Sequence, residues 1–415
     1  MLASRIFAPE SAAATFRLGA LVRALADRAE VRVLTTTPPP SLRGPAIAQG
    51  PTDAPGAVTV SRWPVLRDAT GYVRGYLPYL SFDVPLALRL LAAPRPDVVV
   101  VEPPPTTGAV VRATLAVRSL LQRRRRAGST RRGGSHRAEG PVPYVYYAAD
   151  VWSDATASMG APAPVIAAMR RIETFALRGA RDVVAVSDGV AERVRALVGP
   201  GRATPRVTVV PNGIDTDVFT PGGERHPEAP GTPYLVYAGT ASEWQGAEVF
   251  AEAMRTVVQE EPDARLIFLG QGASWPALQR IQAQLPPGAL ELRPLVPPDE
   301  AAEWQRGAAA ALVSVRPGVG YDFAYPTKVI AALACGAPVI FAGPGPAAQD
   351  VRDHGLGVAV DHDVDQVAAA MLAAVRAGRA GRDPAEAARR VAWVQQHRSL
   401  TATGQAAAEV VLGPV

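Results

Sequence analysis

Two patterns of apolar residues alternate along this chain of 415 residues, and each change of pattern marks a new predicted element. Short apolar runs, such as 97–101 and 144–148, are typical of strands that are buried on both faces. Between such runs, apolar residues return every three or four positions, as in 15–28 and 165–178, which predicts helices with one apolar face. The same strand-then-helix order begins again at 234–237. We therefore expect an α/β protein with two doubly wound parallel sheets.

The join between the two sheets is predicted from local composition. Glycine, proline and arginine are concentrated in 199–206, which favours a linker there. We place the first domain at 1–200 and the second at 201–395. Ligands of open α/β sheets bind beyond the carboxyl ends of the strands, so two sheets that face each other are expected to leave a cleft for them.

Composition and charge exclude several classes of protein. The chain has 43 basic and 38 acidic residues, and a net charge of +5 is too small for a dedicated nucleic-acid binder of this length. Cys335 is the single cysteine and the five histidines are scattered, so we expect neither a disulfide framework nor a metal site built from these residues. No signal peptide begins the chain, and no apolar run reaches the roughly 18 residues of a membrane span. A cytoplasmic location is the expectation.

Part of the positive charge is local. The four arginines at 123–126 are followed by Arg131, Arg132 and Arg137, and they come after a segment with apolar residues at helical spacing. A basic segment beside apolar surface suits the inner face of an anionic membrane, so 109–137 is a candidate for peripheral membrane contact. A solvated loop explains the same residues, and the sequence leaves both interpretations open.

Lys328 is the only lysine among the 43 basic residues. It follows a glycine-rich stretch, 316–325, and a helix is predicted to begin near Pro326. The unpaired N–H groups at the start of a helix favour a phosphate, whereas a cation there is unfavourable unless an anion lies nearby. We expect Lys328 to bind a diphosphate. A solvated lysine on an ordinary helix is the alternative.

The order of several motifs resembles that of glycosyltransferase family 4. These motifs are Pro9-Glu10 before a helix that carries Arg17, Val186-Ser187, PNGID at 211–215, Tyr237-Ala238-Gly239, FLGQG at 268–272 and ACGAPV at 334–339. They occur in the family's order over most of the chain. The resemblance implies the GT-B fold, an α/β architecture in which two doubly wound Rossmann-like domains face a central cleft. It also implies a final helix, at about 396–415, that packs back on the first domain.

The resemblance further implies a reaction. Members of the family are retaining enzymes, so we expect transfer of a hexose-type sugar from a nucleoside diphosphate sugar, linked to UDP or GDP, to a hydroxyl of the acceptor. The acceptor is expected to be a glycan, a lipid-linked molecule or a small molecule, and neither a metal nor another cofactor is expected. The stretch DVWSD at 150–154 resembles the corresponding stretch in family members that act in cell-surface polysaccharide or glycolipid assembly.

The same resemblance assigns residues to the parts of the site. The donor would be bound by Gly239, Thr240, Gln245, Gly270, Val296, Tyr321, Asp322, Lys328, Gly343 and Gly345. The acceptor would be bound by Glu10, Arg17 and Trp152. Lys328 is expected to stabilise the leaving phosphate, and Asp150 or Asp154 to orient the acceptor hydroxyl. Turn formation and helix capping explain both aspartates equally well, and a surface ion pair explains Arg17.

The sequence departs from the family at several charged positions. Two glutamates of the family, eight positions apart, fall on Phe323 and Ala331. An arginine and a lysine that often hold the diphosphate are replaced by Thr240 and Gln245, and Lys328 could supply the missing charge. These departures motivate an alternative, a catalytically silent subunit that binds a nucleotide-sugar or a partner. A sugar-nucleotide epimerase ranks last, because the motifs of the cleft contain no histidine.

Two Asp-x-Asp sequences, 215–217 and 361–363, resemble the metal-binding motif of the other glycosyltransferase fold. Tripeptides of this kind are common in loops, and no metal site is predicted from them.

Overall fold

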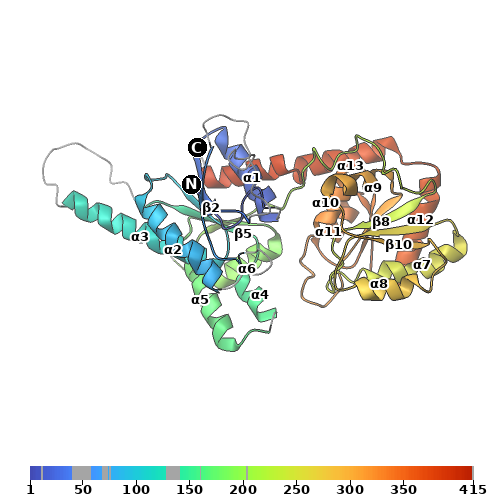
Figure 1. Cartoon of the computed structure of the whole chain (residues 1–415), viewed down its shortest axis with the longest axis horizontal. Helices are drawn as coiled ribbons and strands as arrows, with labels where there is room; N and C mark the ends of the chain where they lie inside the picture. Colours follow the sequence, from blue (N-terminus) through green and yellow to red (C-terminus); the bar gives the residue numbers. More distant parts are fainter. Residues whose placement is uncertain are drawn as a thin grey trace. The chain divides into compact units, whose positions relative to one another are not determined.

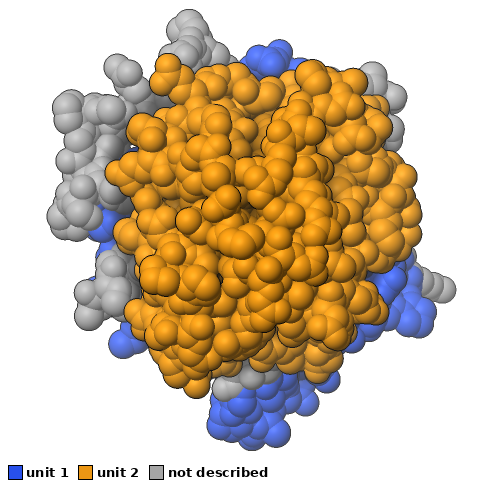
Figure 2. Space-filling model, turned by 90° about the vertical axis from the view of Figure 1, so that its right-hand side faces the viewer, with its two compact units in different colours: residues 1–211, 403–415 blue, residues 212–402 orange. Residues whose placement is uncertain are grey.

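The chain forms two compact units. The computed structural model describes residues 1–10, 13–39, 58–67, 73, 76–127, 141–158, 160–201 and 204–413. Unit 1 comprises Met1–Pro211 together with Thr403–Val415, and unit 2 comprises Asn212–Ala402, which Figure 2 shows in blue and orange. Figure 1 shows the helices and strands of the chain. The chain therefore passes to unit 2 somewhat later than the linker expected from composition. None of the described helices is long and apolar enough to cross a membrane.

Unit 1 is built on a parallel sheet of seven strands. Their order is β3-β2-β1-β4-β5-β6-β7, so the direction of winding reverses between β1 and β4. The strands are β1 (Leu2–Ala3), β2 (Val31–Thr36), β3 (Val58–Trp63), β4 (Val99–Val101), β5 (Tyr144–Ala148), β6 (Asp182–Ala185) and β7 (Arg206–Val209).

Helices cover both faces of this sheet. They are α1 (Ala13–Ala26), α2 (Tyr76–Ala92), α3 (Pro105–Ala127), α4 (Trp152–Ser158), α5 (Ala163–Gly179), α6 (Asp188–Val198) and α14 (Leu400–Leu412). One core contains apolar residues of α2, α3, α5 and α6, and the core on the other face contains residues of α1 and α14. A Cβ atom on Gly404 would lie 2.6 Å from the carbonyl oxygen of Ala20, so glycine permits α14 to pack closely on α1.

Unit 2 repeats the same winding with six parallel strands. Their order is β10-β9-β8-β11-β12-β13, with the reversal between β8 and β11. The strands are β8 (Tyr234–Ala238), β9 (Arg265–Leu269), β10 (Leu290–Arg293), β11 (Ala310–Ser314), β12 (Val339–Ala342) and β13 (Gly357–Val360). Two doubly wound parallel sheets are therefore present, as the periodicity predicts.

The helices of unit 2 form a layer on each face of its sheet. They are α7 (Glu248–Glu260), α8 (Trp275–Gln282), α9 (Pro298–Gly307), α10 (Thr327–Ala334), α11 (Pro346–Asp353), α12 (Val364–Arg379) and α13 (Pro384–His397). Residues of α7, α8 and α12 pack in one core, and residues of α9, α10, α11 and α13 pack in the other. Because both faces are covered, the strands are almost wholly apolar, which explains their sequence pattern.

Two short helices, α4 and α11, were not expected from the sequence. The first begins where the backbone N–H groups of Trp152 and Ser153 donate to the carboxylate of Glu173 at 2.7 and 2.9 Å. These N–H groups have no partner within their own helix, so a distant glutamate on α5 stabilises the start of α4. Local sequence carries no sign of such a contact.

Candidate functional site

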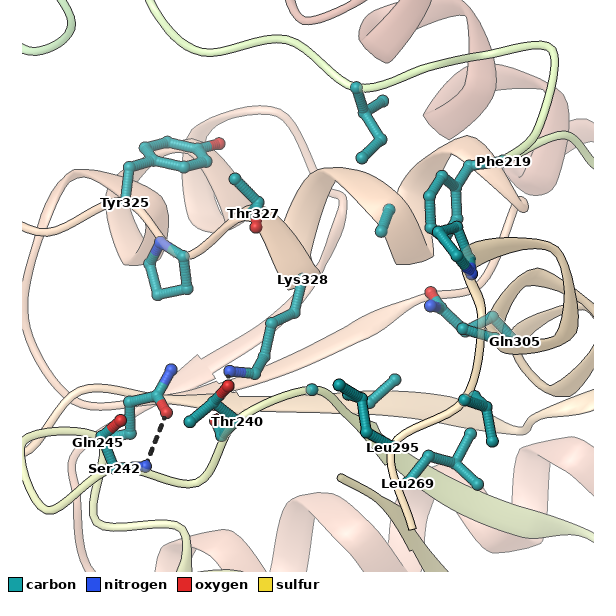
Figure 3. Close-up of a pocket in the computed structure, with 18 of the residues that line it drawn as sticks. Phe219, Thr240, Ser242, Gln245, Leu269, Leu295, Gln305, Tyr325, Thr327 and Lys328 are labelled. Carbon is teal, nitrogen blue, oxygen red and sulfur yellow. Dashed lines mark hydrogen bonds between the residues drawn. The ribbon is translucent and has the colours of Figure 1, made fainter. Parts of the chain in front are cut away.

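A pocket of about 600 Å³ opens in unit 2 at the carboxyl ends of β8, β9 and β10 (Figure 3). The loop after β8, the segment after β10 and the first turn of α10 supply much of its wall. Ile214 and Phe219, from the PNGID region, line it as well. A site at this edge of an open parallel sheet is where such folds bind their ligands.

Lys328 is the only charged side chain among the residues that line this pocket. It lies in the first turn of α10, and its Nζ donates to the carbonyl oxygen of Thr240 at 2.8 Å. The same ammonium lies 4.9 Å from the centre of the Tyr237 ring. Burial lowers the pKa of Lys328 to about 7, because a desolvated ammonium is costly without a counter-charge. A phosphate group would supply that counter-charge.

Glycines allow the loop after β8 to lie close to its neighbours. Gly239 has a φ of +117°, a conformation that side chains rarely adopt, and its backbone N–H donates to Leu269 at 2.7 Å. A Cβ atom on Gly270 would overlap the carbonyl oxygen of Gly239. A Cβ atom on Gly239 would lie 3.4 Å from Cε of Lys328. Gly270 therefore permits the loops after β8 and β9 to lie in close contact, beside Lys328.

Gln245 fixes the conformation of the same loop. Its Oε1 accepts a hydrogen bond from the backbone N–H of Ser242 at 3.1 Å (Figure 3) and another from the hydroxyl of Tyr237 at 3.2 Å. The side chain is buried and also lines the pocket. From the predicted donor residues, the pocket thus brings together Gly239, Thr240, Gln245, Val296 and Lys328.

The other predicted donor residues lie outside the lining of the pocket and shape the neighbouring loops. Tyr321 stacks on Trp244, a lining residue, with ring centres 5.1 Å apart. Asp322 accepts a hydrogen bond from the backbone N–H of Gly318 at 3.1 Å. Gly343 and Gly345 have φ values of +121° and +117°. Gly343 lies against the backbone of Val315, which follows β11, and Gly345 lies against the backbone of Asp322. Gly270 acts through Gly239, as described above.

Gln305, on α9, is a lining residue that the sequence did not single out. Its side chain is only 2% exposed, and within the part of the chain that the structure describes its Oε1 has no hydrogen-bond partner. Leaving such an oxygen unpaired is costly, so a ligand that donates a hydrogen bond here would be favoured. An inward-facing glutamine on a helix gives no distinctive sequence signal.

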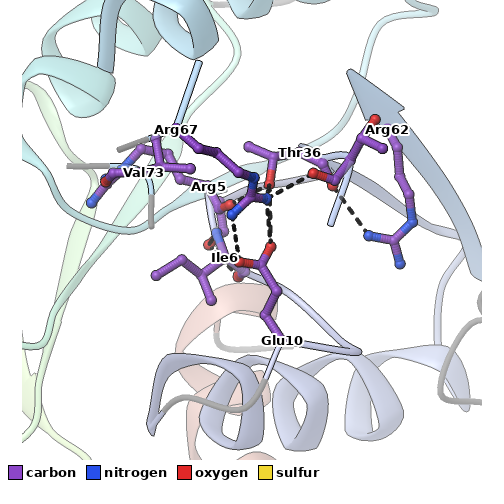
Figure 4. Close-up of polar contacts among 9 residues, drawn as sticks. Arg5, Ile6, Glu10, Thr36, Arg62, Arg67 and Val73 are labelled. Carbon is purple, nitrogen blue, oxygen red and sulfur yellow. Dashed lines mark hydrogen bonds and ion pairs between the residues drawn. The ribbon is translucent and has the colours of Figure 1, made fainter. Parts of the chain in front are cut away.

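The predicted acceptor residues lie in unit 1, near the carboxyl ends of its strands. Glu10 forms an ion pair with Arg67 at 3.0 Å and approaches the hydroxyl of Thr36 at 3.4 Å (Figure 4). Arg17 forms a buried ion pair with Glu102, which follows β4. Both predicted ligands are therefore held in place by neighbours in the absence of an acceptor, and their role in binding it stays a prediction.

Asp150 and Asp154 have different surroundings. Asp150 lies two residues after β5, and partial desolvation raises the pKa of its carboxyl group, an effect that the positive charge of Arg17 opposes. Asp154 lies on α4 and accepts two hydrogen bonds from Arg193, at 2.6 and 2.8 Å. Between them, Trp152 packs edge-on against Tyr79 with ring centres 5.9 Å apart.

The two Asp-x-Asp sequences have local structural contacts. Asp215 accepts a hydrogen bond from the backbone N–H of Asp217 at 3.0 Å, and Asp363 caps α12 through the N–H of Gln366. Among the described residues, no group of three or more histidine, cysteine, aspartate or glutamate side chains could hold a metal ion.

Two family models match the chain. Residues 13–213 match the glycosyl transferase 4-like domain, and residues 232–377 match the glycosyl transferases group 1 domain. Each match lies largely within one of the two units.

Curated relatives are similar over about half of the chain. A D-inositol 3-phosphate glycosyltransferase of Xylanimonas cellulosilytica is 29% identical over 241 residues, which are 52% of this chain and 56% of the relative. A protein of the same name from Geodermatophilus obscurus is 31% identical over 248 residues, which are 54% of this chain and 49% of the relative. The chain thus spans about half the length of the curated relatives it matches.

Solved structures are similar over the whole chain. Anabaena HepE in complex with UDP superimposes with a TM-score of 0.64 at 15% identity, covering 98% of both chains. WaaG, a glycosyltransferase involved in lipopolysaccharide biosynthesis, gives a TM-score of 0.62 at 14% identity, covering 100% of this chain and 99% of the other. At this identity the likeness concerns the fold.

Proposed function

Because the chain belongs to glycosyltransferase family 4 and has the GT-B fold, we propose that it transfers a hexose-type sugar from a UDP- or GDP-sugar to a hydroxyl group, with retention at the anomeric carbon. The observation that carries the proposal is the ammonium of Lys328 in a pocket where no other described lining residue is charged. A nucleoside diphosphate is the ligand that this charge and the start of α10 favour. The UDP bound by Anabaena HepE supports the same class of donor.

Lys328 takes the place of cations that the family usually carries elsewhere. The loop after β8 has Thr240 and Gln245 where an arginine and a lysine are common, so the loop itself brings no charge. The ammonium of Lys328 reaches this loop from α10 and donates to the carbonyl oxygen of Thr240. A diphosphate bound at the loop after β8 would therefore still contact a cation there. That cation is Lys328, which belongs to α10 and not to the loop itself.

The chemistry requires little beyond positioning and charge stabilisation. The bond between the anomeric carbon and the phosphate oxygen breaks, and the acceptor oxygen forms a bond to the same face of that carbon. The acceptor proton passes to the departing phosphate. Lys328 stabilises the charge on this phosphate. Asp150 orients the acceptor hydroxyl, while Glu10, Arg17 and Trp152 bind the rest of the acceptor, which we propose is a glycan or a lipid-linked molecule.

Gln305 offers a replacement for a missing donor contact. The second of the two family glutamates falls on Ala331, which lines the pocket but cannot accept a hydrogen bond through its side chain. Gln305 lines the same pocket from α9, which packs beside α10, and its Oε1 is buried without a partner among the described residues. We propose that the ribose hydroxyls of the donor bond to Gln305.

Thermal stabilisation by nucleotides tests the proposal. Ligands that bind the native state raise the melting temperature, so UDP, GDP, ADP and dTDP are compared on the wild type and on Lys328→Ala. We expect one diphosphate to stabilise the wild type and to lose most of its effect in the variant. Arg280→Ala, at an exposed position on α8, is the matched control. Stabilisation by none of the four would contradict the donor proposal.

Phe323 and Ala331 favour a second candidate, a silent subunit that binds a nucleotide-sugar without transferring it. Release of the nucleoside diphosphate in the presence of acceptors separates the two candidates. Nucleotide-dependent stabilisation without any release across an acceptor screen would support the silent subunit.

A further inference from the structure

Helix α2 is apolar on two of its faces, and only one of them is buried. Phe82, Leu86 and Leu90 recur at four-residue intervals and are at most 1% exposed, because they pack in the core of unit 1. A second stripe faces away from this core. It consists of Leu77, Leu80, Val84, Leu88 and Leu91, whose exposed fractions run from 38% to 69%. A helix that is apolar on both sides normally has partners on both sides.

The neighbouring helix α3 continues this apolar surface. It runs beside α2 (Figure 1), and the guanidinium of Arg118 donates to the carbonyl oxygens of Leu90 and Ala93 at 2.6 and 2.9 Å. Val117, Leu120 and Leu121 of α3 are each about half exposed. We call the two exposed stripes together the α2–α3 face. Apolar side chains exposed on two neighbouring helices of a folded chain are typical of an interaction site.

Arginines follow the exposed apolar residues of α3 along the helix, and neither α2 nor α3 carries an exposed carboxylate. Helix α3 ends in arginines at 123–126 and has no aspartate or glutamate over its whole length. The only carboxylate of α2 is Asp83, which is 1% exposed and accepts a hydrogen bond from Thr107 at 2.7 Å. The partner of the α2–α3 face must therefore be apolar where it meets the leucines and anionic where it meets the arginines.

We propose that the α2–α3 face docks on the surface of a bilayer that contains anionic lipids. The leucines enter the region between headgroups and acyl chains, and the arginines lie at the level of the phosphates. A second copy of the chain fits less well, because α2 and α3 expose no carboxylate that could pair with the arginines of a partner. The membrane segment predicted from sequence, 109–137, included only α3, and residues 128–137 lie outside the described residues. The structure adds α2.

Sedimentation with lipid vesicles tests this docking in the full chain. Vesicles of phosphatidylcholine are compared with vesicles that also contain phosphatidylglycerol. We expect binding to the anionic vesicles only, and release as the salt concentration rises. Leu80→Gln/Leu88→Gln should lower the partition coefficient about tenfold or more, because two leucines no longer enter the bilayer.

Two further variants keep the test sharp. Val358→Gln/Val364→Gln replaces two exposed valines of unit 2 and should bind vesicles as the wild type does. Arg123→Gln/Arg124→Gln leaves the leucines in place and should weaken binding mainly at low salt, which covers the case in which the leucine variant folds poorly.

Three results would overturn the proposal. The first is a wild type that stays in the supernatant with anionic vesicles, and the second is a leucine variant that folds and binds as strongly as the wild type. The third is a wild-type dimer that the leucine variant converts to a monomer, since a second copy would then cover the face. Docking needs no sugar donor. Vesicle binding without any response to nucleotides would therefore support docking and contradict only the proposed transfer reaction.

Discussion

The ammonium of Lys328 lies 2.8 Å from the carbonyl oxygen of Thr240, so the only lysine of the chain joins the start of α10 to the loop after β8. A backbone carbonyl is a weak partner for a partly buried ammonium, and desolvation lowers the pKa of Lys328. A bound anion would therefore stabilise the charged form of Lys328. The predictions below concern the residues around this site and two aspartates of unit 1.

Replacing Lys328 with methionine should weaken nucleotide binding without lowering the stability of the folded protein. We expect the affinity for a nucleoside diphosphate to fall about tenfold to a hundredfold, because a charge-assisted hydrogen bond is lost. The melting temperature of the ligand-free variant should be unchanged or higher, because methionine fills similar space without a buried charge. Calorimetric titration and thermal unfolding measure the two effects. A variant that keeps its affinity would show that Lys328 does not hold the phosphates.

Binding of the donor should depend on pH through Lys328. Its pKa of about 7 in the ligand-free protein means that the charged form prevails only at lower pH. A bound diphosphate favours the charged form, so affinity should fall as pH rises above 7, by at most about tenfold per unit. An intact nucleoside diphosphate sugar is the right probe, because its diphosphate is esterified at both ends. Lys328→Met should remove this slope, and an identical slope in the variant would assign it to another group.

The same lysine should affect the stability of the ligand-free protein with the opposite sign. Its folded pKa of about 7 lies below the ordinary value of 10.5, so the unfolded chain binds more protons between these two pH values. Lys328 therefore contributes a stability that rises with pH across this window and is constant below it. Chemical unfolding of the wild type and Lys328→Met from pH 6 to pH 10 measures the difference. A variant curve parallel to that of the wild type would contradict the lowered pKa.

Gly270→Ala should displace the loop after β8. Its Cβ atom would overlap the carbonyl oxygen of Gly239, so either loop must shift. We expect a loss of about 1–3 kcal/mol in the free energy of unfolding, together with weaker nucleotide binding. Gly231→Ala is the matched control in the same unit, because its new Cβ would have no neighbour within 4 Å. Normal nucleotide binding by Gly270→Ala would show that the close contact of these loops does not shape the site.

Gln305→Leu should weaken nucleotide binding without affecting phosphate binding. If its amide contacts the ribose, the variant should bind the nucleoside diphosphate about tenfold less tightly and inorganic pyrophosphate as the wild type does. Competition binding with both ligands makes this comparison. Equal losses for the two ligands would assign Gln305 to the phosphates or to the shape of the pocket.

Asp150 and Asp154 should respond differently to amidation. Asp154 is committed to an ion pair with Arg193 that is partly exposed, so Asp154→Asn should cost at most about 1 kcal/mol of stability and change transfer little. Asp150→Asn should lower kcat with little change in the KM for the donor, because it is the aspartate proposed to orient the acceptor. Initial rates for both variants with one acceptor test this, and a larger loss in Asp154→Asn would reverse the assignment.

The sequence predicts the fold well because both sheets are covered on both faces. Strands such as 97–101 and 144–148 are then apolar throughout, and the helices between them show one apolar face, so each element carries its own signal. In the pocket of unit 2, Gly239 and Lys328 are among the residues that the sequence singled out, the first through the family motifs and the second as the only lysine. Their role in binding a donor stays a prediction.

The parts that sequence reasoning missed depend on contacts between distant residues. The start of α4 needs the carboxylate of Glu173, and the burial of Gln305 depends on how α9 packs over the pocket. The exposed stripe of α2 was missed for a related reason. Leucines that face solvent and leucines that face the core look alike until the sheet shows which side is covered.

Helix α14 is made after unit 2 but belongs to the core of unit 1. Ala407, Ala408, Val410 and Val411 belong to the same core as the first helix, α1, although nearly four hundred residues separate them. As the chain leaves the ribosome, unit 2 can be completed before this core of unit 1 is closed. Until α14 emerges, the surface of α1 that it covers stays open to water and to other chains. The nascent protein is thus exposed to aggregation at α1 throughout the synthesis of unit 2, and α1 becomes protected only after α14 has been made.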